Sequence, residues 1–254
     1  MKNKLARELI NKGRHDYNLI AGHFSDTRNY LWEDFKFFEK YIDKGDKVLD
    51  AGCGNGRLSE FLQKIKASPA KNSKKNHNAS GVDYTGLDSS SALIKLARKR
   101  HPEEKFVVGD IMNMPFDEDT FDALLAVAVF QHIPSKFFRK KSLKEINRVL
   151  KKGGVFIMTN WNLWQPRFRL LRFEYNLKKI FGSNKMDFND VLKPWKSPDQ
   201  DVLAMRYLHA YKLKEIKKLL EESGFKVLEN YFSFRGQKTN KKEGYNIITV
   251  AKKN

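Results

Sequence analysis

The sequence predicts an α/β fold built around a mainly parallel sheet, and three observations predict it. Short apolar runs alternate with amphipathic segments of helical period along most of the chain. A run that ends at Asp50 is followed by glycines at 52, 54 and 56 and then by a helical segment, the local form of a nucleotide-binding strand–turn–helix unit. Residues 121–129 are apolar on both faces, as a central parallel strand requires. The expected sheet is Rossmann-like and doubly wound, with seven strands and a final antiparallel pair.

Helical periodicity and turn residues predict the elements before the first strand. Leu5, Leu9 and Tyr17 are among the apolar residues that recur near helical spacing in the first segment. The second segment is rich in Trp and Phe, and Lys-Gly-Asp forms the turn that follows. In chain order the expected elements are a helix at 3–21, a polar patch at 23–28, a helix at 31–41 and a turn at 44–46.

The alternation of strands and helices then continues through the core. A serine opens the helix that starts at position 89, and a basic last turn with two glycines ends the helix before the last parallel strand. In chain order the segments are a low-complexity surface loop at 66–81, a strand at 84–88, a helix at 89–100, strands at 105–110 and 121–129, a helix at 136–150, a strand at 155–160, a helix at 212–222 and strands at 226–234 and 245–252.

Residues 161–205 interrupt this pattern with a mixture of Trp, Arg and Lys, and we expect an inserted, largely helical cap there. The chain is expected to be a single domain. Its parts are an N-terminal helical cap at 1–45, a cofactor-binding core at 46–160, a substrate-side insertion at 161–205 and a C-terminal helix and strand pair at 206–254.

The composition limits the classes of protein and of partner. No apolar run approaches the roughly 18 residues that a membrane span needs, and the N-terminus lacks the apolar core of a signal peptide. Cys53 is the one cysteine, so we expect a cytoplasmic protein with no disulfide and no metal site. The net charge of +19 favours nucleic acid or a membrane surface as a partner. A bias toward Lys, spread over solvent-exposed faces of the protein, could also produce much of this charge.

Acids follow the strands at the edge where such sheets bind ligands. Asp50 precedes the glycine turn, Asp88 ends the second strand and Asp110 ends the third. The dinucleotide fingerprint Gly-x-Gly-x-x-Gly fails in both registers, because Arg57 or Ser59 occupies its last position. A phosphate-binding loop with Gly-Lys-Ser/Thr is absent as well.

This combination resembles the class I S-adenosylmethionine-dependent methyltransferases, in particular the type 11 methyltransferases. The resemblance implies that the glycine turn lies against the methionine part of S-adenosylmethionine, that Asp88 takes the ribose hydroxyls, and that Asp110 faces the adenine amine. Carboxylates accept hydrogen bonds from hydroxyls and amines, and an acidic rim tolerates a sulfonium cation. The implied cofactor-binding residues are Asp50, Gly52, Gly54, Asn55, Gly56, Asp88, Ser89, Asp110, Ile111, Ala126 and Val127.

Two methyl acceptors are disfavoured by the residues present. Methylation of pyrimidine carbon commonly uses a nucleophilic cysteine, and Cys53 lies inside the glycine turn. Methylation of exocyclic amines usually needs Asn/Asp-Pro-Pro-Tyr after the fourth strand, where this chain has Phe-Gln-His-Ile at 130–133. An oxygen, a ring nitrogen or a small-molecule acceptor remains.

Outside the core the chain resembles the tRNA wobble-uridine methyltransferases that esterify a carboxymethyl group. The matching segments are His-Phe-Ser-x-Thr-Arg-x-x-x-Trp at 23–32, Gly-Cys-Gly-Asn-Gly at 52–56, Ala-Val-Ala-Val at 126–129, His132, Trp161 and Arg-Tyr-x-His at 206–209. The family pattern is not matched at Glu33, Gln131, Leu208 and the additional segment 66–81, so the identity of the nucleoside stays open. The resemblance implies a tRNA substrate and a possible small activator subunit, with no membrane insertion and no DNA.

The implied reaction needs a positioned carboxylate more than it needs a base, because a carboxylate is ionised at neutral pH. Arg28 and Arg206 are the candidates to orient it, with His132 and His209 as supporting donors. Arg28 could instead bind the carboxylate of the cofactor, Arg206 could be a solvated cation, and either histidine could be structural. The alternative functions are a small-molecule O- or N-methyltransferase and a catalytically silent, cofactor-binding RNA module.

Overall fold

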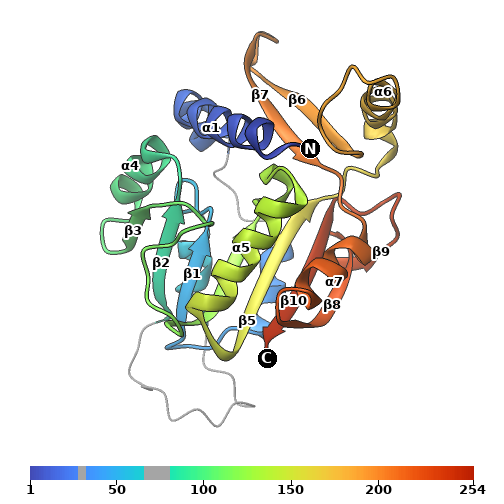
Figure 1. Cartoon of the computed structure of the whole chain (residues 1–254). Coiled ribbons are helices and arrows are strands. Elements are labelled where there is room, and N and C mark those ends of the chain that lie inside the picture. The colour runs from blue at the N-terminus through green and yellow to red at the C-terminus, as the bar shows by residue number, and fades with distance from the viewer. Residues whose placement is uncertain (28–32, 66–80) are drawn as a thin grey trace.

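The computed structural model describes residues 1–27, 33–65 and 81–254. Its main sheet has the strand order β3-β2-β1-β4-β5-β10-β8-β9 (Figure 1). The strands are β1 (Lys47–Ala51), β2 (Asp83–Asp88), β3 (Lys105–Val108), β4 (Phe121–Val127), β5 (Leu150–Trp161), β8 (Phe225–Phe234), β9 (Gln237–Thr239) and β10 (Asn246–Lys253). Neighbouring strands from β3 to β5 are parallel, whereas β10 is antiparallel to both β5 and β8.

The predicted architecture is confirmed, with one strand more than expected. The additional strand is β9, which pairs with the end of β8. Arg235 and Gly236 join the two strands with φ angles of 50° and 77°. Two left-handed residues in succession match the right-handed twist of a tight hairpin, so the chain turns back at once.

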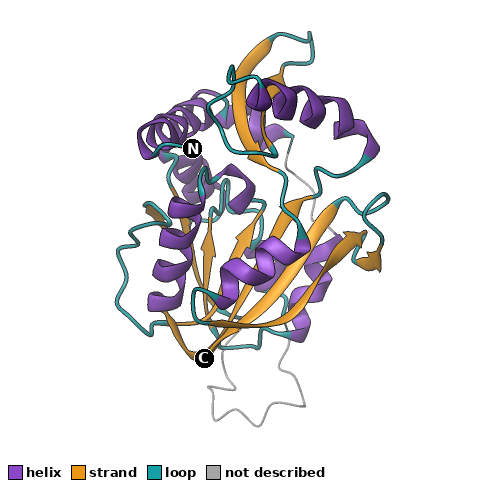
Figure 2. Cartoon of the chain, turned by 45° about the vertical axis from the view of Figure 1, so that its right-hand side comes forward, coloured by secondary structure: helices purple, strands orange, loops and turns teal. Residues whose placement is uncertain are grey.

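Helices cover both faces of the sheet (Figure 2). Helices α5 and α7 pack on one face and η1, α3 and α4 on the other, and alternate residues of β4 point to each face. The helical elements are α1 (Asn3–Leu19), α2 (Ala21–Asp26), the 3₁₀ segment η1 (Glu33–Lys40), α3 (Ser59–Leu62), α4 (Ser91–Arg100), η2 (Phe130–His132), α5 (Lys136–Val149), η3 (Pro166–Phe168), α6 (Arg169–Ile180) and α7 (Leu213–Glu221).

Two helix starts differ from the expected positions for local reasons. Helix α4 begins two residues later than expected, because Ser90 is the capping residue and its hydroxyl accepts a hydrogen bond from the amide of Leu93. The segment expected as a helix at 31–41 forms 3₁₀ turns from Glu33, and residues 31 and 32 lie outside the described residues.

The insertion was predicted to be largely helical, but it also contains antiparallel strands. It contains η3, α6 and the strand β6 (Asp190–Lys196), which pairs with β7 (Val202–His209) in a separate antiparallel hairpin. This hairpin crosses the expected boundary at 205/206. Pro194 obscures the strand pattern in the sequence, yet a two-stranded sheet consists of edges, where proline is tolerated. In Figure 1 the hairpin and α1 lie together at one end of the molecule, and α1 contacts β7.

In the ranges 1–27, 33–65 and 81–254, no helix combines the length and the apolar character that crossing a membrane requires. The expected surface loop at 66–81 falls outside the described residues except for Gly81.

Candidate active site

A cavity of about 230 Å³ lies at the carboxyl ends of β1, β2 and β4, where a doubly wound sheet binds its ligand. The sheet supplies one wall, and α1 and the β6–β7 hairpin supply residues of the opposite side. The polar and aromatic lining residues include Arg14, Tyr17, Phe24, Phe35, Asp50, Asn55, Arg57, Asp88, Ser89, Asp110, His132, Trp161, Arg206 and Tyr207.

The glycine turn presents bare backbone to this cavity. Gly52 and Gly54 have φ angles of 90° and 57°, which side chains rarely adopt. A Cβ atom on Gly52 would lie 2.3 Å from Cγ2 of Val129, and one on Gly54 would lie 3.2 Å from the ring of Phe24. Val129 and Phe24 therefore pack directly against the two glycines, and the glycines themselves line the cavity with backbone only.

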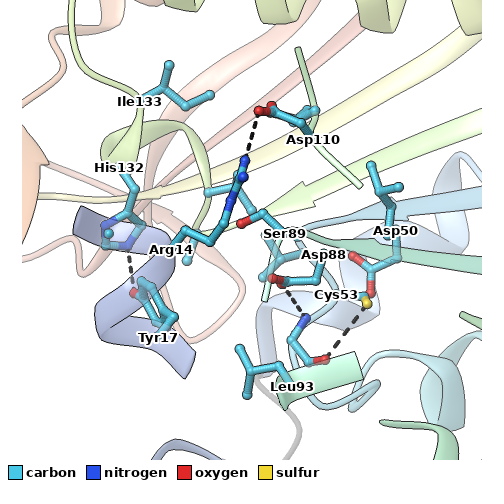
Figure 3. Close-up of a pocket in the computed structure, with 18 of the residues that line it drawn as sticks. Arg14, Tyr17, Asp50, Cys53, Asp88, Ser89, Leu93, Asp110, His132 and Ile133 are labelled. Carbon is cyan, nitrogen blue, oxygen red and sulfur yellow. Dashed lines mark hydrogen bonds and ion pairs between the residues drawn. The ribbon is translucent and has the colours of Figure 1, made fainter. Parts of the chain in front are cut away.

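Asp88 joins the end of β2 to the glycine turn. One carboxylate oxygen accepts a hydrogen bond from the amide of Gly54 at 2.9 Å (Figure 3), and the other accepts from the amide of Ser90 at 2.8 Å. Burial raises the pKa of Asp88, although these amide donors oppose the rise. An ionised carboxylate has more acceptor positions than two amides use, so Asp88 could also accept from two vicinal hydroxyls.

Asp50 is a buried acid beside the same turn. Its side chain is only 1% exposed, and one oxygen accepts a hydrogen bond from the hydroxyl of Tyr84 at 3.0 Å. Burial raises the pKa of Asp50 to about 7; the bond from Tyr84 lowers it, and the nearby charge of Asp88 adds to the rise. The second oxygen has no hydrogen-bond partner among the described residues. A cationic ligand would satisfy this carboxylate, which fits an ammonium or sulfonium group.

Asp110 meets α1 across the cavity. One oxygen accepts from the amide of Met112 at 2.9 Å, and the other lies 3.2 Å from a guanidinium nitrogen of Arg14 (Figure 3). Arg14 and Tyr17 were not predicted for the site, because the periodicity of α1 predicts a buried face but not the residues that this face contacts. Helix α1 thus covers the cavity at this edge of the sheet.

His132 is fixed from two sides. Its Nδ1 lies 3.1 Å from the carbonyl oxygen of Tyr207, and its Nε2 lies 3.2 Å from the hydroxyl of Tyr17. A carbonyl only accepts, so Nδ1 donates and Nε2 accepts from the tyrosine. Burial and the charge of Arg206 lower the pKa of His132 to about 3, despite its bond to the carbonyl. His132 is therefore a neutral imidazole at pH 7.

Arg206 lies between two indole rings. Its guanidinium carbon is 5.1 Å from the ring centroid of Trp161 and 4.5 Å from that of Trp195, and the residue is 6% exposed. Lys193 is its register partner in the hairpin, and burial together with the charges of Arg206 and Arg167 lowers the pKa of Lys193. Cations gathered in a partly dry site favour an anionic ligand.

Most of the residues predicted for the cofactor come together in the cavity lining. They are Asp50, Gly52, Gly54, Asn55, Asp88, Ser89, Asp110, Ile111 and Val127. Gly56 and Ala126 do not line it: a Cβ atom on Gly56 would meet Phe106 and His101, and Ala126 is fully buried in the core.

Only some of the residues predicted for catalysis come together in the cavity. His132 and Arg206 line the cavity, whereas His209 does not, and Arg28 lies outside the described residues. His209 is bound instead by Asp190 at 2.6 Å and Glu215 at 2.9 Å. The physical reason is that β7 is a strand, in which residues three apart point to opposite faces.

The His-Phe-Ser segment of α2 connects the glycine turn to the hairpin. The indole nitrogen of Trp195 donates to His23 at 2.7 Å, and the amide nitrogen of Asn55 donates to the hydroxyl of Ser25 at 3.0 Å. Phe24 between them lines the cavity beside Gly54. This N-terminal motif thus contributes structure on both sides of the site.

The core of the chain is similar to a known family of domains. The Methyltransferase domain family matches residues 49–158. The tRNA (carboxymethyluridine(34)-5-O)-methyltransferase of Arabidopsis thaliana is 33% identical over 155 residues, which are 61% of this chain and 34% of that protein. The namesake enzyme of Schizosaccharomyces pombe is 28% identical, with 84% and 88% covered. A putative methyltransferase of Encephalitozoon cuniculi is 29% identical, with 84% and 87% covered.

Solved structures show the same fold. A SAM-dependent methyltransferase of Methanosarcina mazei has a TM-score of 0.66 at 21% identity, with 85% of this chain and 96% of that chain covered. A putative methyltransferase of Haloferax volcanii, solved in complex with the Trm112 methyltransferase activator, has a TM-score of 0.62 at 18% identity, with 94% and 96% covered. The predictions of a methyltransferase and of S-adenosylmethionine as its cofactor are confirmed.

Proposed function

We propose that this chain, an S-adenosylmethionine-dependent methyltransferase, esterifies the carboxylate of a carboxymethyl-type uridine at the wobble position of tRNA. The observation that carries the proposal is Arg206, a buried guanidinium held between Trp161 and Trp195 in the lining of the cofactor cavity. The names of the Arabidopsis and fission yeast relatives and the net charge of +19 support the same substrate class.

The cofactor would be held by the residues at the strand ends. The backbone of Gly52 and Gly54 would lie against its methionine part, Asp88 would accept from the ribose hydroxyls, and Asp110 with Ile111 would face the adenine. When bound, the cofactor supplies an electrophilic methyl group on a sulfonium. The buried carboxylate of Asp50 would favour that positive charge.

The residues of this chain then have to orient the acceptor rather than deprotonate it. A substrate carboxylate is already ionised at neutral pH, and the low pKa of His132 keeps the imidazole neutral, so neither group must exchange a proton. The planar guanidinium of Arg206 can grip both oxygens of a carboxylate, and the flanking indoles restrict its orientation. Such positioning removes much of the entropic barrier to transfer.

The proposal includes a small activator subunit and a cytoplasmic location. The activator bound to the Haloferax volcanii neighbour supports the first, although that likeness concerns the fold. A tRNA substrate supports the second. Arg28 stays a candidate for either carboxylate.

The test is transfer of labelled methyl groups from S-adenosylmethionine to tRNA with and without the carboxymethyl group. We expect label only on the carboxymethylated tRNA, in a form released by mild alkali because the product is an ester. Arg206→Ala should lower transfer by about tenfold to a hundredfold, since a hydrogen bond to a charged group contributes about 1.5–3 kcal/mol.

Arg172→Ala is the matched control. Arg172 also stacks on an indole, 4.0 Å from the ring centroid of Trp164, and its Nε donates to the carbonyl of Leu163, but it does not line the cavity. This variant should retain transfer. Label that appears on a small acid but on no tRNA would favour the small-molecule alternative, and undiminished transfer by Arg206→Ala would remove the assigned carboxylate site.

A further inference from the structure

Four charged side chains meet outside the cavity, in what we call the buried charge cluster: Arg139 of α5, Asp190 of β6, His209 of β7 and Glu215 of α7. Arg139 lies 3.6 Å from Asp190 and 3.5 Å from Glu215, while His209 lies 2.6 Å and 2.9 Å from the same two acids. Arg139, Asp190 and His209 are almost completely buried, and Glu215 is partly buried.

The hydrogen bonds of the cluster define its charges. Ionised carboxylates only accept, so a histidine bonded through both ring nitrogens to two of them donates twice and is an imidazolium. With His209 charged, two cations balance two anions. Burial alone would raise the pKa of Glu215, yet the bond from His209 and the charges of His209 and Arg139 lower it. Removing one member would leave a buried charge without its counterpart.

Arg139 connects this cluster to the cavity wall. Its Nε donates to the carbonyl of Ile133 at 3.0 Å, and a terminal nitrogen donates to the hydroxyl of Tyr207 at 3.0 Å. Ile133 and Tyr207 both line the cavity, and the carbonyl of Tyr207 accepts from His132. The cluster therefore contacts two parts of the cavity lining: Ile133, which follows η2 in the core, and Tyr207, which belongs to the hairpin.

We propose that Arg139, Asp190, His209 and Glu215 are positioning residues: they fix the β6–β7 hairpin on α5 and α7, so that Arg206 points into the cavity. The alternation of a strand gives the geometry, since Tyr207 and His209 face the cluster while Arg206 faces the indoles. Buried ion pairs commonly contribute little net stability compared with apolar residues, so orientation is the effect that their geometry serves best. The proposal rests on the proposed function for its catalytic readout only.

The test compares His209→Gln with Arg206→Ala and with the double variant. Glutamine leaves one amide donor and no charge in place of the imidazolium. We expect His209→Gln to lower kcat by about tenfold or more while the Kd of S-adenosylmethionine stays within about twofold, because the displaced group is on the acceptor side. When His209→Gln is added to Arg206→Ala, kcat should fall little further, because His209 acts through Arg206.

Two further variants separate positioning from loss of stability. Leu219→Ala removes buried apolar volume from α7 without touching the cluster, so its effect should add to that of Arg206→Ala. Glu215→Gln in the His209→Gln background restores charge balance and should recover part of kcat. Full additivity of His209→Gln with Arg206→Ala, or no rescue by the second glutamine, would overturn the proposal.

Hydrogen exchange supplies a readout that needs no substrate. In His209→Gln the amides of β6 and β7 should exchange several-fold faster, while those of β4 keep the wild-type rate. If the wild type methylates no tRNA but the hairpin amides respond in this way, the proposed function fails and the positioning role stands. If exchange in the hairpin is unchanged, the positioning role fails whatever the substrate.

Discussion

Replacing Gly52 with alanine would put a methyl group into the wall of the cavity that we propose for the cofactor. The added carbon would lie 2.3 Å from Cγ2 and 3.3 Å from Cγ1 of Val129. Val129 is β-branched, so its rotation offers little relief, and it lines the cavity itself. The overlap can be removed only by moving the glycine turn or Val129, and either movement alters the surface on which we propose that the cofactor lies.

The magnitude has two parts. A non-glycine residue at a φ of 90° destabilises the folded state by about 1–2 kcal/mol, and overpacking a filled site destabilises it by about 1–3 kcal/mol. If only the overpacking part opposes binding, the Kd of S-adenosylmethionine should rise by about fivefold to a hundredfold. The backbone part should appear as a lower melting temperature. Isothermal titration calorimetry and thermal unfolding measure the two effects separately.

Gly182→Ala is the matched control. Gly182 has a φ of 76°, close to that of Gly52, but a Cβ atom there would have no neighbour within 4 Å among the described residues. This variant should lower the melting temperature by the backbone part alone and leave the Kd unchanged. If Gly52→Ala binds the cofactor within twofold of the wild type, the close approach of a ligand to this turn is refuted.

Two further predictions concern the acids of the site. Asp88→Asn should raise the Kd of S-adenosylmethionine by about tenfold in calorimetry, because an amide is a weaker acceptor for ribose hydroxyls than a carboxylate; an unchanged Kd would place the ribose elsewhere. Burial raises the native pKa of Asp50 from 3.8 to about 7, so the native state binds this proton more tightly than the unfolded chain. Its contribution to stability is therefore complete below about pH 4 and declines as the pH rises to about 7. In Asp50→Asn the melting temperature should therefore fall less between about pH 4 and pH 7 than in the wild type. Identical pH profiles of the two proteins would contradict the assigned role of Asp50.

Local sequence was enough for the cofactor side because its residues follow strand ends. Once Asp50, Asp88 and Asp110 are assigned to the ends of parallel strands, the topology brings them to one edge of the sheet. Gly56 shows the limit of this inference. It shares the spacing of the other two glycines, but its Cβ position faces Phe106 and not the cavity, which only the course of the turn decides.

The part that α1 has in the site depended on contacts between segments far apart in the chain. Arg14 of α1 reaches Asp110, and Tyr17 reaches His132, through the packing of α1 on β7 and α4. Helical periodicity could predict that α1 has a buried face but could not predict its partner.

The sequence by itself determined the parallel sheet, the glycine turn and the acids that identify a methyltransferase, because each depends on neighbours in the chain and on the edge of one sheet. Only the tertiary structure decided the region that we propose for the methyl acceptor. Arg206 and His209 would share a face on a helix, but the hairpin makes this segment a strand and sends them to opposite faces. One then lies between indoles in the cavity and the other between two buried acids, and that difference arises from long-range packing.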